Sequence, residues 1–177
     1  MTVDWPTEII EQLDWHWTAQ LRPRLDGLGD EEYLWEPTSG AWTIHLDAAP
    51  DARIDWDYPP PDPAPVTTIA WRLAHIVVGC FGVRSASHFG APPVDYGSFP
   101  YARTADAALA QLDSAYAVWL AGVRGWAADG TMERALGPGE GHFAASPRGA
   151  LVLHINREVI HHGAEIALLR DLWAHRS

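Results

Sequence analysis

The sequence predicts an all-α protein, a four-helix bundle with a long proline-rich loop between its first and second long helices. Four segments repeat apolar residues at the spacing of an amphipathic helix, and alternating strand-like patterns are scarce. Helices of this kind bury their apolar stripes against one another in a bundle. The 177 residues are enough for one well-filled core. We therefore expect a single domain over residues 1–177.

The first helix is expected to begin near Pro6, because proline suits the first helical turn, whose N–H groups have no partner within the helix. Gly27 or Gly29 should end it, since glycine readily adopts the left-handed conformation found after a helix. Residues 36–65 are rich in proline and aspartate, which predicts a loop. Loops of this length in compact proteins are usually either functional or disordered. We expect this loop to be ordered, with a short strand pair around residues 42–46.

Capping residues delimit the other three helices. A threonine side chain accepts a hydrogen bond from the backbone at a helix start, and a serine followed by proline is a similar signal. Links rich in glycine and proline separate the helical patterns. We therefore expect helices from Thr67 or Thr68 to about Gly90, from Thr104 to a loop at 130–141, and from Ser146 and Pro147 to about Ala174.

The composition argues against nucleic acid as a partner. The chain has 12 basic and 23 acidic residues and a formal net charge of −11. Neutralising phosphates requires clustered lysine and arginine, and the sequence has no such cluster. Every basic residue is arginine, and alanine, glycine and proline are abundant, a bias typical of GC-rich bacterial genomes.

Three features predict a cytoplasmic protein. The single cysteine, Cys80, cannot form an internal disulfide, which fits a reducing compartment. The first residues lack the basic and apolar regions of a secretory signal. No apolar run approaches the ~20 residues that span a bilayer, so we expect no membrane partner.

The most informative residues are Glu158 and His162, which lie four apart in the last helical pattern. Residues four apart share a helix face, so this carboxylate and imidazole are two ready ligands for one divalent metal. Both fall on the apolar stripe of the helix, where an unpaired carboxylate is costly. His75, on the apolar face of the second helical pattern, is the third candidate. The alternative is a buried hydrogen-bonded pair, or a salt bridge to an arginine such as Arg72.

Two glycines share the helix face of His75. Gly79 and Gly82 each cost about 1 kcal/mol relative to alanine inside a helix, so we expect another group to approach them closely. A tight contact within the protein and a cavity open to a ligand both explain them. His16 is interpreted as a core residue or a neighbour of the same pocket, and Cys80 as a small buried apolar residue.

Three segments resemble the DinB-like (YfiT-like) superfamily, and within it the branch of mycothiol-dependent maleylpyruvate isomerase-like proteins. They are Leu13–Pro37 (LDWHWTAQLRPRLDGLGDEEYLWEP), Thr68–Gly79 (TIAWRLAHIVVG) and Ser146–Trp173 (SPRGALVLHINREVIHHGAEIALLRDLW). The resemblance implies a four-helix bundle with a divalent metal, zinc first and nickel second, held by three side chains. By position these ligands are His75, Glu158 and His162. Many members have histidine where Glu158 stands, and the His/Glu/His set is similar to that of the thiol-dependent branch.

The resemblance therefore implies a metal-dependent thiol transferase. A low-molecular-weight thiol of the mycothiol type would be the cosubstrate, activated for attack on an electrophilic small molecule. The proline-rich loop, with Trp42, His45 and Trp56, would roof the pocket, and a homodimer formed through bundle faces is also implied. The sequence leaves three alternatives open: a metal-dependent hydrolase, a non-catalytic metal-binding stress-response protein, and a bundle whose three residues form only a buried polar network.

Overall fold

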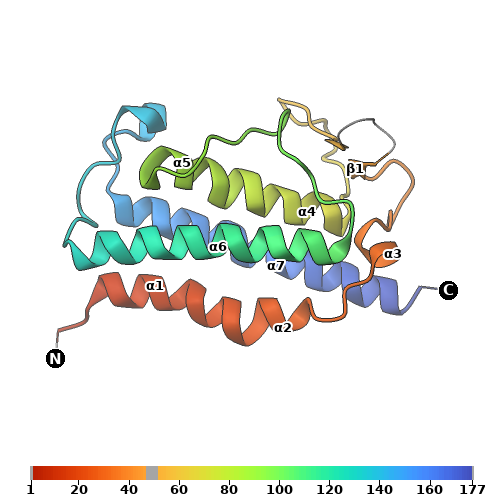
Figure 1. The fold of residues 1–177 in the computed structure, drawn as a ribbon, viewed down its shortest axis with the longest axis horizontal. Helices are drawn as coiled ribbons and strands as arrows, with labels where there is room; N and C mark the ends of the chain where they lie inside the picture. Colours follow the sequence, from red (N-terminus) through yellow and green to blue (C-terminus); the bar gives the residue numbers. More distant parts are fainter. Residues whose placement is uncertain (1, 47–51, 177) are drawn as a thin grey trace.

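The computed structural model describes residues 2–46 and 52–176 and has four long helices packed side by side (Figure 1). The first consists of α1 (Trp5–His16), a π-helical turn η1 (Trp17–Leu21) and α2 (Arg22–Arg24). The second consists of α4 (Ile69–His75), a longer π-helical segment η2 (Ile76–Gly82) and α5 (Val83–Phe89). The third is α6 (Ala105–Ala128), and the fourth is α7 (Arg148–Ala174). The predicted all-α four-helix bundle is confirmed.

Short elements connect the long helices. A single helical turn, α3 (Asp30–Tyr33), and a 3₁₀ segment, η3 (Pro138–Phe143), lie in the links. The strands β1 (Ile44–His45) and β2 (Arg53–Ile54) form an antiparallel pair. The expected strand pair is therefore present, with β1 inside the predicted range and its partner further along the loop. Residues 47–51 of this loop lie outside the described residues.

The caps place most helix ends where the sequence predicts them. Thr68 Oγ1 accepts a hydrogen bond from Trp71 N at 3.2 Å, and Gly90 ends α5 with a positive φ of 70°. The fourth helix differs, because Pro147 precedes its first residue and no side chain caps it. The backbone of Ser146 is instead used in the preceding turn, where its N–H donates to Phe143 O at 2.8 Å. The predicted serine cap is therefore wrong.

The directions of the helices explain the route of the chain. In Figure 1, α1 and α7 run from left to right, whereas α4–α5 and α6 both run from right to left. Because α5 and α6 are parallel, the segment 90–104 between them must return along the length of the bundle. It does so across the outside of α4–α5 and therefore lies against the helix that carries His75.

The core fills the space between the four helices. Trp17 stacks on Tyr116 of α6 with ring centroids 3.8 Å apart, and Trp119 on the same helix is 1% exposed. Stacked aromatic rings of this kind add attraction beyond the area that they bury. Among the described residues, no helix combines the length and apolarity needed to cross a bilayer.

Candidate metal centre

His75 is the last residue of α4 and directly precedes the π-helical segment η2. Such segments are frequent at functional sites. A Cβ at Gly79 would overlap the hydroxyl of Tyr96, and one at Gly82 would lie 2.7 Å from Val94 Cγ2. The Tyr96 hydroxyl in turn lies 2.7 Å from His75 Nδ1. Both glycines therefore make room for the returning segment, so the tight-contact explanation accounts for them.

Glu158 and His162 lie on successive turns of α7, with His162 Nε2 3.4 Å from Glu158 Oε2. His162 is buried at 7% exposure, as its place on the apolar stripe predicts. The Glu158 side chain is 34% exposed, so its predicted place on the buried stripe is wrong. The reason is that the buried face of α7 extends further round, to Val152, Val159 and Gly163, which leaves Glu158 at its edge.

The structure brings all three predicted residues together. One potential ligand atom each of His75, Glu158 and His162 lies within 4.8 Å of the other two. Two ligands bound to a tetrahedral ion at 2.0–2.1 Å are about 3.3–3.4 Å apart. The 3.4 Å between His162 Nε2 and Glu158 Oε2 fits that separation and is long for a hydrogen bond. The separation of this pair is therefore compatible with two ligands of one cation.

Glu165 orients the imidazole of His162. Its Oε2 lies 2.7 Å from His162 Nδ1, and because an ionised carboxylate only accepts, Nδ1 carries the proton. The lone pair of His162 is then on Nε2, the atom that faces Glu158. Arg72 Nε lies 3.0 Å from the same Glu165 oxygen, so Arg72 anchors Glu165. A carboxylate behind a metal-binding histidine fixes its tautomer and raises its basicity.

Both imidazoles of the cluster are held neutral. Burial, then the charges of His162 and Arg72, lower the pKa of His75 to about 3. Burial also lowers the pKa of His162, although its hydrogen bond to Glu165 acts in the opposite direction. At neutral pH both rings therefore lack the second proton, and the neutral ring is the form that binds a metal.

A second group of potential ligands overlaps the first. His161, His162 and Glu165 also offer atoms within 4.8 Å of one another. His161 is mostly exposed, with 68% of its side chain accessible. Glu165 is already paired with the guanidinium of Arg72 and with His162 Nδ1, so its carboxylate is less free to bind a cation. The first group, which draws on two helices, is therefore the better candidate.

Aromatic rings cover the cluster on the side of the proline-rich loop. Trp71 stacks on His75 with ring centroids 5.2 Å apart. Trp56, from the loop, stacks on Tyr96 with centroids 4.0 Å apart. Trp42 lies beside Trp71, with centroids 5.8 Å apart. Tyr96 was missed in the sequence because it lies in an irregular segment with no periodic pattern.

Three residues considered in the sequence lie outside the cluster. His45 Nε2 pairs with Asp55 Oδ1 at 2.7 Å, so it does not reach the cluster. His16 Nδ1 is 2.8 Å from the amide oxygen of a glutamine one turn further along its own helix. Cys80 is 2% exposed, and burial, then the charge of Glu158, raise the pKa of its thiol to about 12. The prediction of Cys80 as a small buried residue is confirmed.

Comparison with known proteins identifies the family. A family model described as the DinB superfamily matches residues 12–166. No curated protein and no solved structure gives a significant match. The matched range contains His75, Glu158 and His162 and covers well over half of the chain, and it distinguishes no branch within the superfamily. The protein is therefore a member of the DinB superfamily.

Proposed function

We propose that His75, Glu158 and His162 together hold one divalent metal ion. The observation that carries this proposal is their convergence from α4 and α7 to within 4.8 Å. Two supporting features are the lowered pKa values of both histidines and the carboxylate of Glu165 behind His162. Three protein ligands with one partly exposed are typical of a catalytic metal site rather than a structural one.

Zinc is the first choice of metal and nickel the second. Two imidazoles and one carboxylate form a nitrogen and oxygen ligand set that suits both ions. Affinity alone does not select between them in a cell, because availability also decides occupancy.

We further propose that the protein is a thiol transferase. When bound, the cation supplies a Lewis acid that lowers the pKa of a low-molecular-weight thiol such as mycothiol. In the reaction a bond forms between the thiol sulfur and the electrophilic carbon, and the thiol proton passes to a base or to water. In a substitution the leaving group departs with its electron pair. In an addition the neighbouring carbon gains a proton.

The residues around the cluster divide it into a closed side and an open side. On the closed side, Tyr96 contacts His75 and stacks on Trp56. On the open side, Glu158 lies between His162 and His154, whose Nδ1 is 3.5 Å from Glu158 Oε1. The His154 side chain is 42% exposed, so this side of the cluster is open to solvent, which can take up the thiol proton.

The first test is metal content, measured by elemental mass spectrometry on protein purified without a metal-affinity tag. We expect nearly one metal per chain in the wild type and nearly none in His162→Ala, with helicity checked by circular dichroism. His161→Ala is the matched control, because its exposed ring lies outside the proposed ligand set, and it should retain the metal. Loss in His161→Ala, or retention in His162→Ala, would contradict the assignment.

The second test separates a transferase from a hydrolase and from a binding protein. Metal-loaded protein is mixed with an activated electrophile, with and without an added thiol, and the products are identified by mass spectrometry. A thiol adduct that requires both the metal and the thiol supports the transferase. A hydrolysed product that forms without thiol indicates metal-activated water. No product from a panel of electrophiles favours the non-catalytic alternative.

A further inference from the structure

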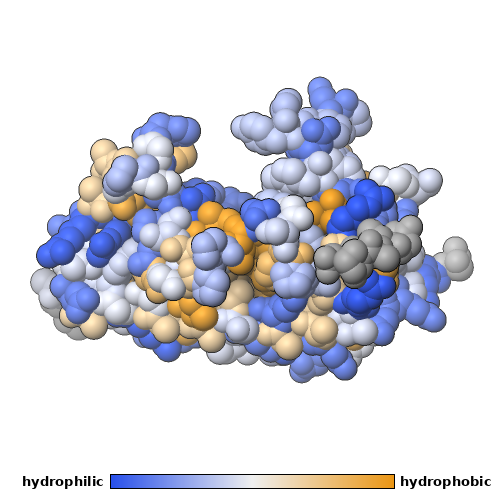
Figure 2. Space-filling view, turned by 45° about the horizontal axis from the view of Figure 1, so that its top comes forward, coloured by the Kyte–Doolittle hydropathy of each residue, from blue (hydrophilic) through white to orange (hydrophobic). Residues whose placement is uncertain are grey.

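A hollow of about 500 Å³ lies on the far side of the returning segment from His75. Figure 2 shows apolar surface gathered in the middle of the face that α5, α6 and this segment form, with more hydrophilic residues toward both ends. Pockets that bind small molecules commonly have volumes of about 300–1,000 Å³. Residues that form its walls include Val77, Ser85, Val94, Phe99, Gln111 and Ala115.

The lining is uncharged and mainly aliphatic. None of the residues that line the hollow is ionisable, and a buried charge without a partner is strongly unfavourable. Phe99 is the single aromatic ring, and the remaining apolar walls consist of valine, alanine, proline and glycine. A neutral ligand with an aliphatic body fits these walls better than a charged or polyaromatic one.

Ser85 supplies a polar anchor. It is 2% exposed, and its hydroxyl has no hydrogen-bond partner among the described residues. Most buried hydroxyls are paired, because an unpaired one loses its bonds to water and gains nothing in return. Ser85 and Val77 are the most deeply buried residues of the lining. The unpaired hydroxyl is enclosed by protein atoms, and a turn of the serine side chain toward the hollow would give it a partner on a bound ligand.

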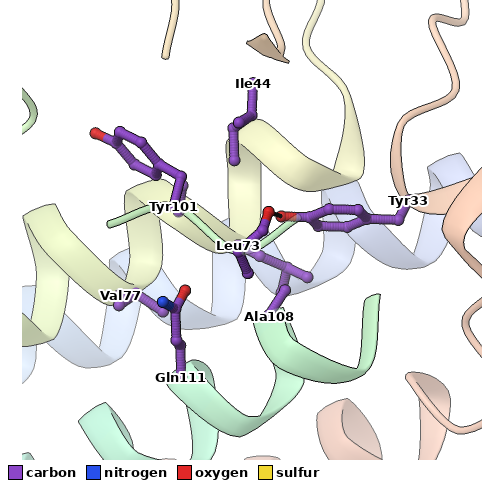
Figure 3. A pocket seen from close by; sticks show the side chains of 9 residues that line it. Tyr33, Ile44, Leu73, Val77, Tyr101, Ala108 and Gln111 are labelled. Atoms are coloured by element: carbon purple, nitrogen blue, oxygen red, sulfur yellow. Dashed lines mark hydrogen bonds between the residues drawn. The ribbon is translucent and has the colours of Figure 1, made fainter. Parts of the chain in front are cut away.

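Gln111 is a second polar residue in the wall of the larger hollow. Its Nε2 donates to Pro100 O at 2.8 Å, which ties α6 to the returning segment. Figure 3 shows Gln111 extending from α6 toward Val77 on the neighbouring helix.

A second, smaller hollow is enclosed by the residues drawn in Figure 3, among them Tyr33 and Tyr101, and has a volume of only about 10 Å³. That volume corresponds to about one water molecule, so only the larger hollow has room for an organic ligand.

We propose that the larger hollow binds a neutral aliphatic molecule that carries one hydroxyl or carbonyl group, which forms a hydrogen bond with Ser85. This site is independent of the proposed metal centre. The returning segment separates them: Tyr96 contacts His75 on one side, whereas Val94 and Phe99 line the hollow on the other.

The probe for the experiment is 1-octanol, a neutral aliphatic alcohol, titrated into ¹⁵N-labelled protein and followed by two-dimensional NMR. We expect saturable shifts of amides in 77–85, 91–100 and 110–118. Octanoate has the same chain with a negative charge, and we expect it to bind at least tenfold more weakly, because the hollow offers no cation.

Two pairs of variants test the contacts. Ser85→Ala should raise the Kd for 1-octanol about fivefold, the effect of one neutral hydrogen bond, whereas Ser87→Ala, on the exposed face of α5, should not change it. Ala115→Phe should occupy part of the hollow and weaken the binding of 1-octanol, whereas Ala117→Phe, on the exposed face of α6, should not.

Three results would overturn the proposal: no saturable shifts in the wild type, 1-octanol binding as tightly to Ala115→Phe as to the wild type, or octanoate binding as tightly as 1-octanol. An unchanged Kd in Ser85→Ala would overturn the role of its hydroxyl. The Kd in His162→Ala should equal that of the wild type, so the outcome does not depend on whether a metal binds.

Discussion

Protonation of the His75 imidazole is disfavoured at mildly acidic pH, and the pKa of the His162 imidazole is lowered in the same direction. Burial and neighbouring charges lower the pKa of His75 to about 3, and burial lowers that of His162. Histidine in an unfolded chain titrates near about 6.5. Below that pH the unfolded state binds protons that the folded state does not, so the free energy of unfolding must fall as the pH falls.

This linkage predicts the effect of His75→Asn on the metal-free protein. As the pH falls below about 6.5, His75 should lower the free energy of unfolding with a slope that approaches about 1.4 kcal/mol per pH unit near pH 5. His75→Asn should flatten the slope by about that amount. Denaturant unfolding at closely spaced pH values measures it. The control, His161→Asn, changes an exposed ring and should keep the wild-type slope. Equal slopes for His75→Asn and the wild type would show that burial does not hold this ring neutral.

The three clustered residues were predictable because each carries a local signal. Glu158 and His162 have the spacing of one helix face, and His75 lies in a second apolar helix. Glu165 carried a similar signal, three residues from His162, yet its role depends on Arg72 from another helix. Tyr96 carried none, because its contact with His75 arises only when the segment after α5 turns back along the bundle.

At the scale of single helices, caps were predictable and π-helical segments were not. Helices begin after Thr68 and Thr104, and one ends before Gly90, where the sequence predicts these boundaries. A capping residue acts on the backbone next to it, so its effect is visible in a short stretch of sequence. The π-helical geometry of residues 76–82 instead depends on packing against neighbouring segments, which no local pattern reports.

Two glycines of α6 provide a matched test of helix packing. A Cβ at Gly122 would overlap the ring of Phe89 on α5, whereas a Cβ at Gly125 would meet nothing within 4 Å. Gly122→Ala should therefore destabilise the protein by about 1–3 kcal/mol through overpacking. Gly125→Ala should stabilise it by about 0.5–1 kcal/mol, because alanine favours the helix.

Chemical denaturation of both glycine variants measures the two free energies of unfolding side by side. The opposite signs are the decisive feature, since helix propensity alone would stabilise both variants. If Gly122→Ala proved as stable as Gly125→Ala, the close contact between α5 and α6 at Phe89 would be wrong.

At the scale of the whole molecule, the cluster joins parts of the chain that are distant in sequence. His75 comes from the second long helix, whereas Glu158 and His162 come from the fourth. Only the folded chain brings them together, so a metal bound there must stabilise the fold over the unfolded state. The net charge of −11 also favours cations near the protein over anions.

The proposed metal therefore predicts a change in melting temperature. At a free metal concentration about 100 times the Kd, binding to the folded state alone adds about 2.7 kcal/mol of stability. For a chain of this size that gain raises the Tm by about 5–10 °C. Calorimetry on chelator-treated protein, before and after one equivalent or more of Zn²⁺, measures the shift. His161→Ala should show the full rise and His162→Ala almost none. A rise of the same size in His162→Ala would place the metal elsewhere, because that variant lacks the imidazole on which both candidate ligand groups depend.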